Sequence, residues 1–155
     1  MINDVVQAIA IALHKEFGDA YQIYADDIAQ GLTGPCFFIA QLSVTLVPYI
    51  GKRRNNACLF DIHYFSKTRT NSELNAVAVR LFDCLRLIAS PQSHQYLGSD
   101  IHTEKEDGVL HCFVTYHFTT RDEIVKDNTM TDMDITSELE GMNDEKENRT
   151  ERNYR

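Results

Sequence analysis

The chain has 155 residues, a formal net charge of −8 and an apolar fraction of 43%, which fits one soluble domain with its own hydrophobic core. No apolar run reaches the roughly 18–20 residues of a membrane span, and the first residues lack the basic start of a secretory signal. The negative charge argues against a surface devoted to nucleic acid, because binding phosphates requires clustered Lys and Arg. We therefore expect a soluble protein made in the cytoplasm.

The first part of the chain predicts a helix and two strands. Apolar residues recur at helical spacing over residues 3–17, with Asn3 placed to cap the helix and Gly18 to end it. A short strand is expected over 21–24, and a long strand over 36–49. One predicted face of the long strand carries Phe38, Ala40, Leu42, Val44 and Leu46. The other carries Phe37, Ile39, Gln41, Ser43 and Thr45.

The middle of the chain predicts a hairpin, a second helix and a second hairpin. Residues 51–56 are expected to form the turn between the long strand and a strand over 57–66. A helix over about 71–89 begins with a capping-box spacing, Thr70 and Glu73, and ends at Ser90-Pro91. Strands over 99–105 and 109–119 flank a tight turn at Asp107-Gly108.

This order of elements predicts an α+β fold. We expect an antiparallel or mixed sheet of about four to five strands with two helices packed on one face. Residues 1–120 would form this single domain. The second face of the sheet is predicted to carry Phe37, Ile39, Leu59, Phe65 and Phe113. That is more apolar area than water usually covers, so we expect a partner subunit on this face.

Residues 121–155 differ in composition from the rest of the chain. They hold 11 acidic and 6 basic residues and few aromatic ones, which predicts a flexible, acidic C-terminal arm. Within it, Met130, Met133, Ile135 and Leu139 are spaced to dock on another surface. We expect this segment to become ordered on a neighbouring subunit.

The four cysteines, Cys36, Cys58, Cys84 and Cys112, form no C-x-x-C pair and lie in apolar runs. In a cytoplasmic protein this predicts reduced thiols that act as small apolar residues.

The sequence carries no recognised catalytic or phosphate-binding motif, so we expect no enzymatic activity and no cofactor. One weak candidate for a metal site remains: His63, His111 and Asp61, together with His117, fall on the less apolar face of predicted strands. The basic run Lys52, Arg53 and Arg54 lies at the predicted hairpin tip. It is either a solvated turn or a contact with an acidic surface of a partner or with nucleic acid.

Several segments together resemble a family of small phage and prophage proteins described as tail terminators. They are Glu16-Phe17-Gly18-Asp19, Tyr21-Gln22-Ile23-Tyr24, Ile28-Ala29-Gln30-Gly31-Leu32, Pro35-Cys36-Phe37-Phe38-Ile39, Gly51-Lys52-Arg53, Phe60-Asp61-Ile62-His63-Tyr64-Phe65 and the stretch Met133 to Leu139. The resemblance covers residues 1–140, and its motifs are structural.

The resemblance implies a structural tail protein that is made in the bacterial cytoplasm and incorporated into a phage virion or a phage-tail-like particle. Such proteins form a ring, usually a hexamer, on the head-proximal end of the tail tube, and end its polymerisation. The implied partners are other copies of the chain, the tube protein, the sheath protein in a contractile tail and the head connector. DNA would only pass through the lumen. The loop Lys52 to Arg54 would face the tube or the lumen.

Three alternatives stay open. A different tail-completion or head–tail joining protein would lie at the head–tail junction and not at the tube end. A metal-dependent hydrolase would use His63, His111 and Asp61. A regulatory binding module would use the acidic arm as a mimic of nucleic acid. The resemblance also leaves open an infectious phage or a headless bacteriocin, and a contractile or a non-contractile tail.

Overall fold

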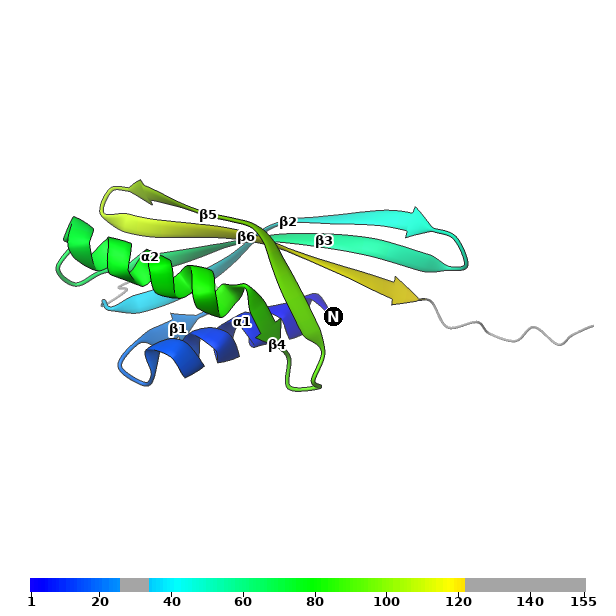
Figure 1. Cartoon of the computed structure of the whole chain (residues 1–155), viewed down its shortest axis with the longest axis horizontal. Coiled ribbons are helices and arrows are strands. Elements are labelled where there is room, and N and C mark those ends of the chain that lie inside the picture. Colours follow the sequence, from blue (N-terminus) through cyan, green and yellow to red (C-terminus); the bar gives the residue numbers. More distant parts are fainter. Residues whose placement is uncertain (26–33, 122–155) are drawn as a thin grey trace, which may run out of the picture. The chain divides into compact units, whose positions relative to one another are not determined.

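The computed structural model describes residues 1–25 and 34–121. Two helices and six strands follow one another in this part of the chain (Figure 1). They are α1 (Ile2–Phe17), β1 (Gln22–Tyr24), β2 (Cys36–Tyr49), β3 (Arg53–Phe65), α2 (Asn71–Leu85), β4 (Leu87–Ala89), β5 (Gln95–Glu106) and β6 (Val109–Arg121).

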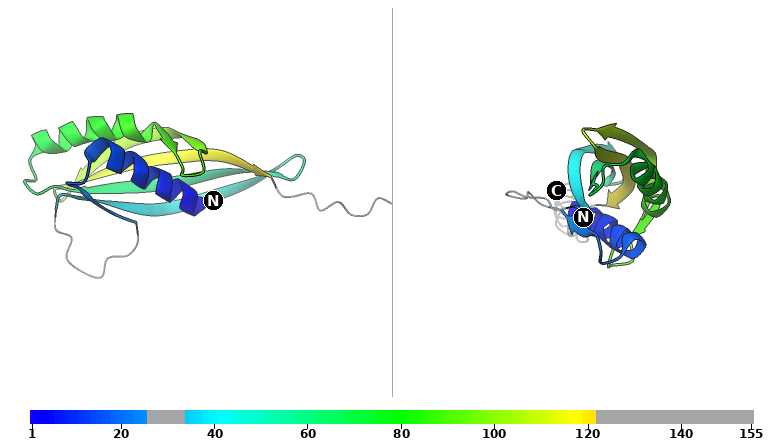
Figure 2. Two further views of the ribbon diagram at one scale, coloured as in Figure 1. Left: turned by 90° about the horizontal axis from the view of Figure 1, so that it is seen from below. Right: turned by 90° about the vertical axis from the view of Figure 1, so that its left-hand side faces the viewer.

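The strands form one mixed sheet in the order β1-β2-β3-β6-β5-β4. Only β1 and β2 run parallel, and all other neighbours are antiparallel. Both helices lie on the same side of the sheet (Figure 2). The predicted α+β class is therefore confirmed, with six strands where about four to five were expected.

Helix α1 forms because its apolar residues return every three to four positions and point at the sheet. Its buried residues are Val5, Ala8, Ile9, Leu13 and Phe17. The predicted cap was wrong: Met1 occupies the N-cap position without a side-chain hydrogen bond, and Asn3 lies inside the helix. Gly18 ends the helix as expected, with a φ of 76° and its N–H bonded to the carbonyl of His14.

Helix α2 is shorter than predicted, because the chain leaves it after Leu85 and forms β4 over Leu87–Ala89. Ile88 is buried in β4, and the predicted helix would also bury it. Its apolar character therefore did not distinguish a strand from a helix at this position. The hydroxyl of Thr70 accepts a hydrogen bond from the backbone N–H of Glu73, as the capping box predicts. The Glu73 carboxylate instead accepts hydrogen bonds from the hydroxyls of Tyr64, Ser66 and Thr68.

The predicted faces of β2 were wrong over the first half of the strand. Phe37 and Ile39 are buried against the helices, at 0% and 2% exposure, opposite Tyr64 and Ile62 of β3. The register then shifts between Gln41 and Ser43. Such a bulge moves every later side chain to the other face. The unbroken alternation that was predicted for residues 36–49 is therefore wrong for this strand.

Aromatic rings join α1 to the sheet. Phe17 lies 4.6 Å from Phe37, and Phe37 lies 5.0 Å from Tyr64, measured between ring centroids. Tyr21 packs on Phe17 and Phe37 at 5.3 and 5.7 Å. These spacings are typical of favourable tilted aromatic pairs, which stabilise a core beyond the area they bury.

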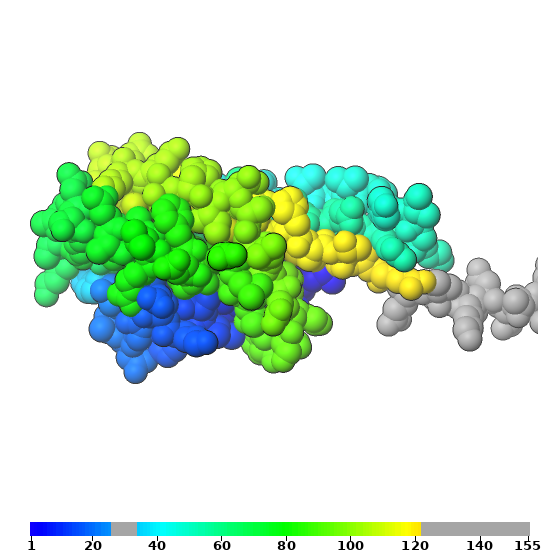
Figure 3. Space-filling view, in the orientation of Figure 1, coloured from blue at the N-terminus to red at the C-terminus, as the bar shows by residue number. Residues whose placement is uncertain are grey.

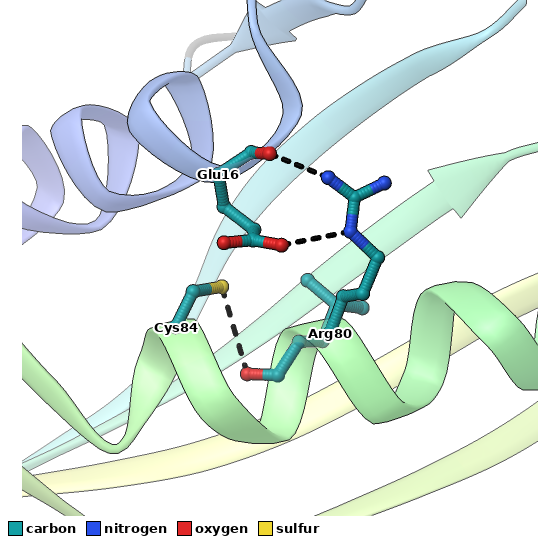
Figure 4. Close-up of polar contacts among 4 residues, drawn as sticks. Glu16, Arg80 and Cys84 are labelled. Atoms are coloured by element: carbon teal, nitrogen blue, oxygen red, sulfur yellow. Dashed lines mark hydrogen bonds and ion pairs between the residues drawn. The ribbon is translucent and has the colours of Figure 1, made fainter.

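The two helices are also joined directly (Figure 4). Arg80 of α2 donates from Nε to the Glu16 carboxylate of α1 at 2.8 Å, and its guanidinium lies 4.2 Å from the ring centroid of Phe17. Nearby, the Cys84 thiol donates to the carbonyl oxygen of Leu81 at 3.6 Å. The helix layer is thus held by an ion pair at its surface and by apolar packing beneath it.

All four cysteines are free thiols, and Cys36, Cys58 and Cys112 are buried as predicted, with Cys84 half-buried. Burial raises the pKa of the Cys84 and Cys112 thiols to about 12. These thiols are therefore protonated at neutral pH and are inert core residues.

Candidate functional site on the hairpin and the uncovered sheet face

The outer part of the β2–β3 hairpin extends past the helix layer. We call residues 42–55 the distal hairpin. Figure 2 shows it reaching beyond both helices, and Figure 3 shows its surface, in cyan, projecting from the rest of the described unit. Every residue of this segment is exposed. The hairpin is held by continuous pairing from Ser43↔Leu59 to Tyr49↔Arg53, and β6 pairs with its β3 strand out to Arg121.

The exposed side chains of the distal hairpin are largely apolar. They have exposed fractions between 39% and 83% and comprise Leu42, Val44, Leu46, Val47, Tyr49 and Ile50. Because of the bulge, Val44 and Leu46 follow the face that the helices cover further along the sheet. They are nevertheless 39% and 49% exposed, because the distal hairpin reaches beyond both helices (Figure 2). A cluster of large apolar residues on a projecting element is typical of a protein-binding surface.

The outer edge of β2 is also open. Strand β1 pairs only with Cys36, Phe37 and Phe38, so no described strand pairs with the same edge further along. The strand Cys36–Tyr49 contains no charged residue, and Pro48 is its only residue without a backbone N–H. Long uncharged edge strands invite pairing with another chain, although β2 carries two features that limit such pairing, the bulge between Gln41 and Ser43 and Pro48 near its end. This edge is suited to contact a neighbouring subunit.

The tip of the hairpin is basic, and its turn is tighter than predicted. Strand β3 begins at Arg53, so residues 53–56, expected in the turn, belong to the strand. The chain turns through Gly51 and Lys52, whose φ angles are 74° and 59°. Arg53 lies opposite Arg121 of β6 in the register. Like charges placed directly opposite each other destabilise a strand pair, and this pairing concentrates positive charge at the end of the hairpin.

The face of the sheet opposite the helices is lined by aromatic and histidine side chains. Leu59, Phe65 and Phe113 are half-buried there, as the sequence predicted. Phe38 lies on this face, where Phe37 and Ile39 were predicted to lie, because the alternation of β2 before its bulge is shifted by one residue from the predicted alternation. Phe38 packs edge-on against His63 at 5.6 Å, and His102 stacks on Phe113 at 4.9 Å. Because neither described helix lies on it (Figure 2), we call this surface the uncovered face.

Asp61, His63 and His111 meet at the centre of the uncovered face. His63 and His111 lie directly opposite each other on β3 and β6, with ring centroids 4.3 Å apart. Oδ2 of Asp61 lies 2.8 Å from Nε2 of His63 and 3.0 Å from Nδ1 of His111. The three ligand atoms all lie within 4.8 Å of one another. The structure thus brings together the three residues that the sequence singled out as a weak metal candidate.

The Asp61 carboxylate is buried and incompletely paired. Asp61 is 5% exposed, and its second oxygen, Oδ1, has no hydrogen-bond partner among the described residues. Burial by itself would raise the pKa of this carboxyl group. Hydrogen bonds from His63 and His111 outweigh that effect and hold the pKa below its usual value. Asp61 is therefore a carboxylate at neutral pH.

Other predicted site residues lie apart from this cluster or outside the described part of the chain. His117 lies opposite Ala57, at the distal end of β6, and is exposed. Met130, Met133, Ile135 and Leu139 lie outside the described residues, so their docking role stays a prediction. The distal hairpin was not predicted as a surface, because apolar alternation alone does not reveal where a helix layer ends.

Neither described helix is long and apolar enough to cross a lipid bilayer.

A family model described as "Phage tail terminator protein" matches residues 4–130 of the chain. No curated protein matches the sequence. Among solved structures, a chain of the "Virion of native gene transfer agent (GTA) particle" aligns with a TM-score of 0.55 at 10% identity. The alignment covers 78% of this chain and 97% of that one. At this identity the likeness extends to the fold.

Proposed function

Because this chain belongs to the phage tail terminator protein family, and is therefore a structural protein of the phage tail, we propose that its subunits form a closed ring on the tail tube. The ring is a hexamer that covers the head-proximal end of the tube, ends its polymerisation and offers a joining surface to the head connector. The observation that carries this proposal is the distal hairpin, with six large apolar residues exposed beyond the helix layer.

The hairpin supplies the kind of contact that a ring needs. In a ring, one patch on each subunit meets a different patch on the next subunit. A projecting element and a flat receiving surface satisfy that requirement without self-complementarity. In our proposal the distal hairpin of one subunit lies on its neighbour, and its open β2 edge adds backbone hydrogen bonds to the apolar contact.

The basic tip defines a second contact. Lys52 and Arg53, with Arg121 beside them, concentrate positive charge at the end of the hairpin. The chain as a whole is acidic, so this charge is local. We propose that the tip faces the tube protein or the lumen, where an acidic surface or the passing DNA offsets the repulsion between Arg53 and Arg121.

The C-terminal arm would complete the interface. Its apolar residues, Met130, Met133, Ile135 and Leu139, would dock on a neighbouring subunit, which adds contact area at the cost of ordering the arm. Deleting residues 122–155 tests this step. The truncated chain should keep its folded circular dichroism spectrum and lose ring assembly, whereas a module that mimics nucleic acid through the arm would lose its target binding.

The decisive experiment is electron microscopy of particles produced without this protein. Tubes of uncontrolled length are expected, because nothing then ends polymerisation. Tubes of normal length that lack heads would favour the alternative hypothesis, a head–tail joining protein that acts at the junction. Native mass spectrometry provides an independent check: a stable dimer as the sole assembly, even with tail tube present, would contradict the ring.

The proposed ring fits both types of tail and both types of particle. In a contractile tail the same ring would also contact the sheath protein, and in a headless bacteriocin it would cap the tube without receiving a head. The family is structural, which agrees with the expectation that the chain is not an enzyme.

A further inference from the structure

We propose that Asp61, His63 and His111 form a binding site for a divalent transition-metal ion, with Zn²⁺ as its representative. Two imidazoles and one carboxylate are the donor set that such ions favour in proteins. The three donors come from adjacent strands in the middle of the sheet, where continuous pairing fixes their backbone. The site lies apart from the distal hairpin and does not depend on the proposed ring.

The distances are close to those a metal requires. Ligand atoms about 2.0–2.2 Å from a tetrahedral zinc ion lie roughly 3.3–3.6 Å from one another. The two nitrogens lie 2.8 and 3.0 Å from Oδ2 of Asp61. An ion between these atoms requires each imidazole nitrogen to move away from Oδ2 by a few tenths of an ångström.

The buried carboxylate supplies a reason for a cation. Both histidines approach the same oxygen, Oδ2, and leave Oδ1 buried without a partner among the described residues. A buried polar atom without a partner costs about 1–3 kcal/mol, and more when it carries charge. A dication at this position would interact with the whole carboxylate and compensate for its burial.

Space and access are both provided. On one side of Asp61 the neighbouring residue in the register is Ala40, whose small side chain leaves room at the carboxylate. The side chains of His63 and His111 are 23% and 19% exposed, so a fourth ligand can enter from the uncovered face. Phe38 and Phe65 flank His63 at 5.6 and 6.2 Å and shield the site from bulk water, which strengthens charge interactions.

The donor types also predict selectivity. Imidazole nitrogens suit Zn²⁺, Co²⁺ and Ni²⁺, whereas Mg²⁺ prefers oxygen ligands and retains its waters. The site should therefore take up Zn²⁺ and leave Mg²⁺ unbound.

The test is calorimetric titration of the full, chelator-treated chain with ZnCl₂ and, separately, with MgCl₂. One Zn²⁺ per chain and no measurable heat from Mg²⁺ are expected. His111→Ala and His63→Ala should each weaken zinc binding by at least roughly 10–100-fold. Losing an outer hydrogen-bond partner already costs a metal site that much, and these residues are direct ligands in the proposal. His117→Ala is the matched control, an exposed histidine on the same strand as His111 that should leave binding unchanged.

Cobalt provides a second readout. Co²⁺ bound at the site should give the visible absorption of a low-coordinate ion with nitrogen and oxygen ligands, and Asp61→Asn, which preserves the shape of the side chain, should diminish that spectrum. Circular dichroism verifies that each variant folds. If His111→Ala does not fold, His63→Ala provides the test. Absence of zinc binding would overturn the assignment. Equal zinc affinity in the folded wild type and His63→Ala chains would also overturn it, because the ion would then bind elsewhere.

Discussion

The phenolic hydroxyl of Tyr116 donates a hydrogen bond to the carbonyl oxygen of Leu85 across 2.8 Å, and both residues are fully buried. The bond joins central strand β6 to the last turn of α2, where backbone carbonyls lack partners within the helix. Tyr116→Phe should lower the free energy of unfolding by about 1–3 kcal/mol, because it leaves that carbonyl unsatisfied. Urea denaturation measures the change, with the exposed Tyr49→Phe as a near-silent control.

The same carbonyl limits the residue that can stand at position 98. A Cβ added to Gly98 would lie 2.6 Å from the Leu85 oxygen and 3.0 Å from Cγ2 of Val114. Since a backbone carbonyl cannot move aside cheaply, Gly98→Ala should destabilise the chain by about 1–3 kcal/mol. Gly51→Ala separates this steric effect from backbone strain: it has free space but a φ of 74°, and should cost about 1–2 kcal/mol. Thermal unfolding reports both, and an unchanged melting temperature for Gly98→Ala would contradict the packing described.

Arg80 should contribute to stability through both of its contacts. Its side chain is 42% exposed and that of Glu16 38%, so solvent screens the ion pair, and we expect Arg80→Ala to cost only about 0.5–1 kcal/mol. A double-mutant cycle with Glu16→Gln isolates the ion pair from the stacking on Phe17. A coupling energy of zero would mean that the stacking alone carries the effect.

Glu73 should make part of the stability depend on acid. Hydrogen bonds from Thr68, Tyr64 and Ser66 hold the pKa of its carboxyl group below the ordinary value of 4.5. A group with a lowered folded-state pKa stabilises the fold above the unfolded pKa and loses that contribution as the pH falls through the folded value. The stability difference between wild type and Glu73→Gln should therefore be constant near neutral pH and shrink below about 4.5. Urea denaturation at several pH values measures this difference, with the exposed Glu106→Gln as the control. A difference between wild type and Glu73→Gln that stays the same at low pH would contradict the prediction.

The distal hairpin should matter for assembly and not for folding. Val47 and Ile50 are 52% and 83% exposed, so replacing both with Ser removes apolar contact area without disturbing the core. We expect normal thermal unfolding and a loss of ring formation in native mass spectrometry. Val79→Ser on α2, a residue 61% exposed outside the hairpin, is the matched control. Rings that persist in the double variant would exclude the hairpin as the subunit contact.

The sequence predicted most elements of this fold because their periodicities are strong. Helix α1 and strands β3 and β6 follow simple apolar patterns, and both the helix-covered face of β3 and that of β6 were identified correctly. The errors lie where a local rule is broken. Strand β4 has three residues, too few to display a period, and the bulge after Gln41 exchanges the faces of β2 in the middle of an apolar strand.

The candidate site illustrates the same limit. That Asp61 and His63 share a face follows from their spacing of two residues. That His111 is the direct neighbour of His63 depends on the pairing register of strands separated by a helix and two further strands, which no local pattern specifies. The strongest reason to consider a cation is that Oδ1 of Asp61 has no hydrogen-bond partner among the described residues, and no sequence pattern can show this.

The bulge after Gln41 divides the evolutionary constraints on β2. Before it, Phe37 and Ile39 are packed against the helices, so most substitutions at these two positions would destabilise the fold. The residues after it are all exposed, so substitutions there would disturb the core far less. The outer half of the hairpin is therefore free to change in step with the surface it meets, and related particles could diverge in subunit pairing while they keep the same core.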